Sequence, residues 1–451
     1  MSAVVKASRK VSAPLLLTAV FLALTLPVIA VQRGGTGAAL DQEVYHLPTI
    51  EAFAAELPSP DLEEANVAMG PLFHLTLAPV ARFVSDERPV LLAFALVFSL
   101  GAVLAAYFVV VRLVESRLAL ALVLPLACSH YVVQSAGWLN TDNMALLFAV
   151  VVLAGCLGLA GDRAWPWLVG VAALLCVWTR QSYAWLVGVI LLTGAFAFTA
   201  GGEPTARRTA LAATPPVVGL IALVVVWGGL APPRFKGDVE PSPEVFAFTL
   251  ALFGLFAVPY LIAANQSIAK MLVAVVRDRG SAVAAALGAA TALAPVPSKA
   301  IEEGFTGGAL WLTVNKAPLI AGVSPLLVLL AAWGALVALR WYRLHRDAGR
   351  LREGVLILTA LFGVALAHAA KIHVLHKYFE PLVLVLLALL AALALADDWP
   401  ERSERSRRVA FAALGALVAI QLLGVSLEVY GEMSQSPPID QAYGDLKDGA
   451  R

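Results

Sequence analysis

Two carboxylates and an imidazole lie close together in residues 41–46, after the first long apolar stretch of the chain. A carboxylate that is screened from water can take a proton from a hydroxyl group, so Asp41 and Glu43 are candidate general bases. His46 completes the cluster. A solvated loop charge is the simpler interpretation of either carboxylate taken alone. The segment is therefore a candidate catalytic centre that needs support from other parts of the chain.

Polar residues also gather where two later apolar stretches begin. Asn140, Asp142 and Asn143 precede one of them, and a helix N-cap would explain one of the three but not all. Arg180 and Gln181 lie between two apolar stretches joined by almost no loop, which places Arg180 near the membrane plane. Ionisable groups beside membrane helices are costly and tend to be functional, although a snorkelling arginine is the alternative.

Two further polar segments follow. Lys236 and Asp238 flank a glycine in a proline-rich segment, and Lys371, His376 and Lys377 belong to a cluster of His and Lys between two apolar stretches. Adjacent lysines repel a cation, so no metal is expected in this cluster. The attraction between lysine and phosphate gains strength where the dielectric falls, so the cluster favours a phosphate group.

The composition explains what must position these residues. Of the 451 residues, 60% are hydrophobic and only 14% are charged, and the mean hydropathy is +0.83. A soluble domain carries about a quarter charged residues, so much of this surface must face lipid. At roughly 20 apolar residues per span, we expect about thirteen helices. Their ranges are 13–31, 90–111, 118–135, 143–160, 165–179, 183–200, 209–230, 246–264, 281–297, 318–339, 354–370, 378–396 and 409–427.

The sequence predicts an all-α, polytopic protein with a single membrane domain over residues 1–451. The first span follows three basic residues but is followed by many others, so we expect a retained helix rather than a cleaved signal peptide. Residues 32–89 form the first long loop. Within it, the pattern of 49–57 and the apolar segment 71–84 predict short amphipathic helices on the membrane surface. Residues 428–451 form a polar C-terminal tail.

Basic residues predict the orientation. With the N-terminus in the cytoplasm, most Lys and Arg fall in the inside segments, which favours an odd number of spans and an outside C-terminus. Arg180, Lys236, Lys371 and Lys377 then lie on the outside, against this trend, and binding an anion is one reason for it. The formal charge of +1 indicates no nucleic-acid partner. The three cysteines have the spacing of neither a zinc site nor a disulfide framework, and we expect small buried side chains.

Four of these segments, taken in order, resemble a known family. The motifs are 43–48 (EVYHLP), 180–182 (RQS), 236–238 (KGD, after Trp227) and 377–381 (KYFEP). They are similar to motifs of the dolichyl-phosphate-glucose-dependent α-1,2-glucosyltransferases, which belong to the GT-C class of membrane glycosyltransferases. The likeness covers about residues 40–385. Gln42 departs from the pattern, because the family has an Asp directly before its Glu.

The resemblance implies a GT-C-like bundle of about 11–13 transmembrane helices. It implies transfer of a hexose, with glucose expected, from a polyprenyl-phosphate donor to a glycan, lipid or protein acceptor outside the cytoplasm, with inversion. Asp41 or Glu43 would be the base, and the choice stays open at this point. The lipid bilayer is the other partner, and no cofactor or metal is required. The remaining residues would bind substrate: His46, Asn140, Asp142, Arg180, Gln181, Lys236, Asp238, Lys371, His376, Lys377 and Tyr378.

Two alternatives stay open. A transporter or flippase of a sugar or a lipid-linked sugar would also be polytopic, although the sequence has no convincing internal repeat. A GT-C enzyme that uses mannose or arabinose, or that modifies a protein, would share the same motifs. The Ala-, Leu- and Val-rich composition indicates a microbe, so we expect the plasma membrane, with the site on its extracytoplasmic face.

Overall fold

The structure is a computed structural model. It describes residues 2–34, 36–158, 165–199, 203–235, 244–293, 310, 313–314, 317–369, 376–439 and 441–442. In these residues the secondary structure is helical, apart from two isolated bridges between single residues. The chain divides into two compact units. Unit 1 comprises Met1–Val109, Val123–Gly237 and Val418–Arg451, and unit 2 comprises Val110–Leu122 and Asp238–Leu417.

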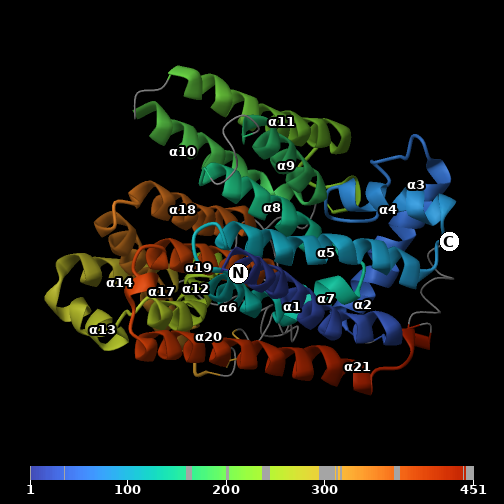
Figure 1. The fold of residues 1–451 in the computed structure, drawn as a ribbon. Coiled ribbons are helices and arrows are strands. Elements are labelled where there is room, and N and C mark those ends of the chain that lie inside the picture. Colours follow the sequence, from blue (N-terminus) through green and yellow to red (C-terminus); the bar gives the residue numbers. More distant parts are fainter. Residues whose placement is uncertain are drawn as a thin grey trace. The chain divides into compact units, whose positions relative to one another are not determined.

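Unit 1 contains the first loop and the green helices α8–α11, which pack against one another (Figure 1). Its helices are α1 (Ser2–Val31), α2 (Gly37–Asp41), η1 (Gln42–His46), α3 (Leu47–Glu56), α4 (Leu72–Phe83), α5 (Arg88–Val110), α7 (His130–Gly137), α8 (Asp142–Cys156), α9 (Trp165–Thr179), η2 (Gln181–Ala184), α10 (Trp185–Thr199), α11 (Glu203–Trp227), η3 (Pro233–Phe235), η6 (Val425–Gly431) and α21 (Glu432–Gln435).

Unit 2 is built around α12 and α17. Its helices are α12 (Glu244–Ala263), α13 (Ile268–Arg277), α14 (Arg279–Thr291), α17 (Pro325–Asp347), α18 (Leu351–His368), η4 (His376–Tyr378), α19 (Glu380–Leu395) and η5 (Trp399–Glu401). Helices α6 (Ser116–Ala127) and α20 (Glu404–Gly424) contribute residues to both units.

The contact between α12 and α17 depends on two glycines. A Cβ atom added to Gly254 would lie 2.8 Å from the Cα atom of Gly334, closer than real Cβ contacts come. The Trp333 indole donates a hydrogen bond of 2.9 Å to the carbonyl oxygen of Gly254. Small residues allow membrane helices to approach in this way, which gains dispersion contacts and buries the polar indole group.

Seven helices in the described residues are long and apolar enough to cross a membrane. They are Ser12–Val31, Arg88–Val110, Arg207–Trp227, Glu244–Ala263, Pro325–Asp347, Leu351–His368 and Glu404–Gln435. The polytopic, all-α class predicted from the composition is therefore confirmed. Helix formation also continues past 428, the predicted start of the polar tail, to Gln435.

The other predicted spans differ in length. Helices α6 and α7, which cover the predicted span 118–135, are bent by 64° at a short break. The spans predicted over 143–160, 165–179, 183–200 and 378–396 correspond to the shorter apolar helices α8, α9, α10 and α19. The prediction 281–297 corresponds to α14, a helix of 13 residues rich in Ala and Gly. At this length α14 is too short to be counted among the long apolar helices.

The C-terminal segment lies against the start of the first loop. The backbone N–H of Gly34 donates to the carbonyl oxygen of Pro437 at 2.9 Å, and Arg33 forms an isolated bridge with Pro438. The Tyr430 hydroxyl donates to the carbonyl oxygen of Leu24 at 2.7 Å. Backbone groups that pair in this way lie on one side of a membrane. An even number of spans between Gly34 and Pro437 gives this arrangement, and the first span then makes the total odd.

Candidate active site in unit 1

The carboxylates of the first loop lie on continuous helical backbone. The Thr36 hydroxyl caps α2 by accepting a hydrogen bond of 3.0 Å from the Ala39 N–H, and η1 and α3 follow directly. Pro48 lies in the first turn of α3, where its missing N–H is no loss. Residues two apart on a helix do not share a face. Asp41 is accordingly half-buried, whereas Glu43 is buried.

Glu43 forms an ion pair with Arg88 at the start of α5. The Arg88 Nε atom lies 2.8 Å from one carboxylate oxygen, and Nη2 donates to the other at 2.9 Å. The side chain of Glu43 is 1% exposed and that of Arg88 is 18% exposed. A two-point pair of this kind is strong and geometrically specific. Glu43 therefore holds a structural contact, and Asp41 is the carboxylate of the two that reaches the surface.

Gln42 connects this segment to the break between α7 and α8. Its amide group donates to the side-chain oxygen of Gln32 at 3.1 Å and to Glu43 at 3.0 Å. Its amide oxygen accepts a hydrogen bond of 2.9 Å from the backbone N–H of Leu139. Gln42 is fully buried, so each of these bonds replaces one lost to water. The residue that departs from the family pattern thus fastens the start of η1 to Leu139, three residues before Asp142.

Asp142 and Arg180, two of the predicted site residues, form an ion pair with each other. The Asn140 side chain prepares this position by accepting a hydrogen bond of 3.0 Å from the Asp142 N–H. The Arg180 side chain is 4% exposed and that of Asp142 is 15% exposed. Arg180 has extended backbone between α9 and η2, so the break in the helix directs its side chain toward α8. The neighbouring Asn143 donates to the Ser99 hydroxyl and the Val132 carbonyl.

Gln181 closes a ring of contacts around this site. It donates a hydrogen bond of 2.7 Å to the carbonyl oxygen of Ala68, in the loop between α3 and α4. In the same loop, the Asn66 amide donates at 3.2 Å to the carbonyl oxygen of Val44 in η1. The Trp227 indole donates at 2.9 Å to the carbonyl oxygen of Leu62. The first loop is thus fastened to the acidic segment, to the Arg180 junction and to the end of α11.

His46 is buried against a second histidine, His74 of α4. The Nδ1 atom of His46 lies 2.9 Å from the Nε2 atom of His74, and the two rings stack with centroids 5.2 Å apart. The rings of Phe53 and Phe73 contact the pair edge-on. Burial, and then the proximity of His46, hold the pKa of His74 well below its usual value of 6.5. His74 is therefore neutral at physiological pH, and one of the two facing nitrogens donates while the other accepts.

The later motifs belong to unit 2 or lie outside the described residues. In unit 2, the Lys377 ammonium lies 5.5 Å from the centre of the Tyr378 ring, which in turn stacks on His368 with centroids 5.2 Å apart. His376 lies in the same short helix, η4. The predictions for Lys236, Asp238 and Lys371 fall outside the described residues. Among described residues, no group of three or more His, Cys, Asp or Glu could hold a metal ion.

Three residues of the site were not predicted from the sequence. Nothing in the sequence marked Arg88 or Gln42 as a site residue, because their partners are set by the three-dimensional packing and not by sequence spacing. His74 had a signal, since an ionisable side chain within an apolar segment is costly and indicates a special role.

The long apolar helices define an integral, multi-pass membrane protein. No family model matches the chain, and no curated protein matches it. Among solved structures, the chain is similar to ArnT from Cupriavidus metallidurans bound to undecaprenyl phosphate, with 12% identity over 90% of this chain and 87% of ArnT and a TM-score of 0.41. It is also similar to the oligosaccharyltransferase of Archaeoglobus fulgidus, with 14% identity over 90% of this chain and 56% of that one and a TM-score of 0.35. TM-scores of this size transfer neither a fold nor an activity to the chain.

Proposed function

We propose that this chain is a membrane glycosyltransferase of the GT-C class. It would move a hexose, with glucose expected, from a polyprenyl-phosphate donor to an acceptor outside the cytoplasm. The supporting observation is the ring of hydrogen bonds in unit 1. Through it, Gln42 is bonded to Leu139, three residues before Asp142, which forms the ion pair with Arg180. Acid–base and anion-binding groups from two separate sequence motifs thus belong to one connected cluster.

In this proposal Asp41 is the general base. It takes the proton of an acceptor hydroxyl, while the hydroxyl oxygen bonds to the anomeric carbon of the sugar with inversion. The bond from that carbon to the phosphate oxygen breaks, and the polyprenyl phosphate leaves with its electron pair. Glu43 is the less suitable base because both of its oxygens are bound to Arg88.

Arg180 is proposed to stabilise the charge that develops on the leaving phosphate. A guanidinium has five N–H donors, so Arg180 can keep Asp142 and also bind phosphate oxygens. Its burial lowers the local dielectric, which strengthens the attraction to a dianion. Asp142, the more exposed partner, and Asn140 would bind sugar hydroxyls. His46 would orient donor or acceptor, with His74 fixing its tautomer.

The remaining motif residues are assigned by the family resemblance alone. Lys371, His376, Lys377 and Tyr378 would contact the donor phosphate, and Lys236 and Asp238 would contribute to the donor site. The acceptor class stays a glycan, a lipid or a protein, and the microbial plasma membrane is the proposed location.

The test uses full-length protein in lipid nanodiscs with radiolabelled polyprenyl-phosphate glucose, mannose or arabinose and a membrane extract as the acceptor source. Asp41→Asn should lower turnover by about 10²–10⁴-fold, the size of a general-base contribution. Asp86→Asn is the matched control, because Asp86 is an exposed acid of the same loop. Full turnover in folded Asp41→Asn protein would contradict the assignment of the base. In sealed vesicles, movement of the labelled donor without any transfer product would favour the transporter instead.

A further inference from the structure

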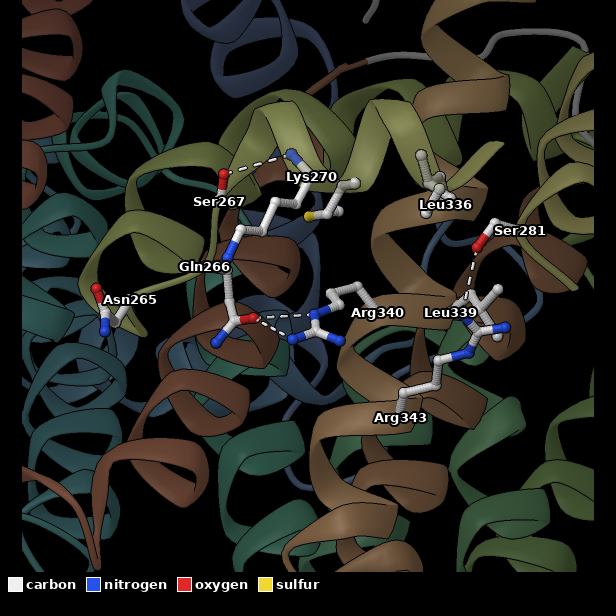
Figure 2. Close-up of a pocket in the computed structure, with 11 residues that line it drawn as sticks. Asn265, Gln266, Ser267, Lys270, Ser281, Leu336, Leu339, Arg340 and Arg343 are labelled. Atoms are coloured by element: carbon white, nitrogen blue, oxygen red, sulfur yellow. Dashed lines mark hydrogen bonds between the residues drawn. The ribbon is translucent and has the colours of Figure 1, made fainter. Parts of the chain in front are cut away.

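A polar cavity of about 370 Å³ lies in unit 2, far along the chain from the motifs discussed above. It is formed where α12 ends, by the first turns of α13, the start of α14 and the last turns of α17. Figure 2 shows that Gln266, Lys270, Ser281, Arg340 and Arg343 line it. We call this cavity the α13–α17 pocket.

Positive charge is in excess in the α13–α17 pocket. Arg343 pairs with Asp278 at 2.6 Å and also donates to the Ser281 hydroxyl at 3.2 Å. By contrast, Lys270 and Arg340 have no carboxylate partner in the part of the chain that the structure describes. Three cations thus face one anion. Hydrogen bonds from Ser281 and Arg343 hold the pKa of Asp278 well below its usual range, so that anion stays charged.

Arg340 is already oriented to bind an acceptor at two points. Its Nε and Nη2 atoms both donate to the side-chain oxygen of Gln266, at 2.9 and 2.5 Å (Figure 2). An amide oxygen is a neutral acceptor, and a phosphate oxygen in its place would make stronger, charge-assisted bonds. The N-terminus of α13 opens beside Gln266, with Ser267 as its cap, and adds the positive end of a helix dipole.

The surface of α13 beside the pocket is apolar. Leu272, Val273 and Val276 are 54, 47 and 89% exposed. Exposed apolar side chains next to a basic patch are typical of helices that lie at the boundary of headgroups and acyl chains. The basic residues of this region predict that it faces the cytoplasm. The cytoplasmic leaflet is the surface that attracts basic segments through its anionic lipids.

We propose that the α13–α17 pocket binds a phosphate group, with Lys270 and Arg340 as its charge partners and Arg343 at its edge. The apolar surface of α13 favours the headgroup of an anionic phospholipid as the source of this phosphate. Free phosphate is the other source with the same chemistry. The site is separate from the transfer chemistry proposed for unit 1, so its test does not depend on any activity.

The experiment measures lipid retention by native mass spectrometry on full-length protein in detergent. The probes are phosphatidylglycerol, phosphatidylcholine and inorganic phosphate as a competitor. Lys270→Gln and Arg340→Gln should each lower retention of phosphatidylglycerol about fivefold, because each removes about 1 kcal/mol of attraction from a cation that lines the pocket and contacts the headgroup. Arg277→Gln and Arg346→Gln are the matched controls, because they remove one charge from each of α13 and α17 without lining the pocket. They should leave retention unchanged.

The outcomes distinguish the two sources of phosphate and test the proposed site. Preference of the wild-type protein for phosphatidylglycerol that inorganic phosphate does not displace supports the lipid headgroup. Displacement by inorganic phosphate, with no difference between the two lipids, supports free phosphate at the same residues. Equal losses in the pocket and control variants would overturn the proposal, because a general surface charge would then explain binding. Absence of both lipid preference and phosphate binding in the wild type would overturn it without any variant.

Discussion

The arginines of the proposed active site in unit 1 and those of the α13–α17 pocket in unit 2 differ in their partners and in their burial. In unit 1, Arg88 lies on Glu43 and Arg180 lies on Asp142, and each pair is largely buried. A buried charge without a partner costs several kcal/mol, so such a site has to be built with both charges present. The charges of unit 1 are therefore part of the fold itself.

In the α13–α17 pocket, Arg340 lies on the neutral Gln266, and Lys270 is exposed. Partial exposure lets water screen these cations, so the pocket is stable without an anion. The comparison shows how burial separates two kinds of charged site. Buried pairs fix the positions of catalytic groups, whereas half-exposed cations leave charge for a ligand to neutralise.

The largest loss of stability is expected from the substitution Arg180→Gln. It leaves Asp142 without its partner in a largely buried position, which costs about 3–5 kcal/mol of stability. The double variant Arg180→Gln with Asp142→Asn removes both charges and should recover much of this loss while staying inactive. Thermal unfolding in nanodiscs measures the loss and recovery of stability. The sugar-transfer assay measures the activity of both variants. Recovery of transfer by the double variant would show that Arg180 only pairs with Asp142.

A smaller loss is expected from Glu43→Gln. It weakens the contact to Arg88, which keeps some access to water, so the cost is about 1–3 kcal/mol. The folded fraction of Glu43→Gln should keep its turnover, unlike that of Asp41→Asn. The measurement is turnover per folded molecule, with size-exclusion chromatography to count folded protein. If Glu43→Gln abolishes turnover while Asp41→Asn preserves it, the two carboxylates have to exchange roles.

The histidine pair predicts a pH effect of intermediate size. The folded pKa of His74 is depressed below the unfolded value of 6.5, so its contribution to stability is complete above pH 6.5. Below that pH the unfolded chain takes up a proton that the folded chain does not, and stability falls by at most about 1.4 kcal/mol per pH unit. His74→Phe should flatten the dependence of the melting temperature on pH between 7 and 5.5. Equal slopes for variant and wild type would exclude the pair as the cause.

The smallest effect on stability is expected from Asp278→Asn. Asn caps a helix about as well as Asp, so α14 keeps its N-cap. The lost ion pair with Arg343 is exposed to water, so the melting temperature should change little. Removing the one anion beside the α13–α17 pocket should raise phosphatidylglycerol retention about fivefold. Native mass spectrometry with Asp347→Asn as the exposed control measures this. Unchanged retention would mean that Asp278 does not weaken binding in the pocket.

Several parts of this structure could be predicted from the sequence. Long apolar windows predicted α1 and α5, because crossing a membrane requires a fixed length of apolar residues. Asp142 and Arg180 were predicted as site residues because ionisable groups beside membrane helices are costly. In the structure these two residues form an ion pair. Their catalytic roles stay predictions.

Other parts depended on tertiary contacts that sequence spacing does not encode. The segment from Gln42 to His46 was expected to be loop and is a π-helix. The side chain of its first residue, Gln42, is bonded to Leu139 and Gln32 from other elements. Arg88 is far from Glu43 in the chain, so nothing in the sequence paired them. The break between α6 and α7 divided the predicted span 118–135 for the same reason, whereas the break at Arg180 lies where the sequence placed it.

The contacts between the two ends of the chain have a consequence for its biogenesis. The bond from Tyr430 to Leu24 joins residues 406 positions apart, and Gly34 pairs with Pro437. At the usual speed of translation, roughly 20–80 s pass between the synthesis of these two partners. Leu24 and Gly34 can therefore make these contacts only after Tyr430 and Pro437 have been synthesised. A nascent chain released before residue 430 would lack both contacts, so the region around Leu24 and Gly34 reaches its final packing only late in synthesis.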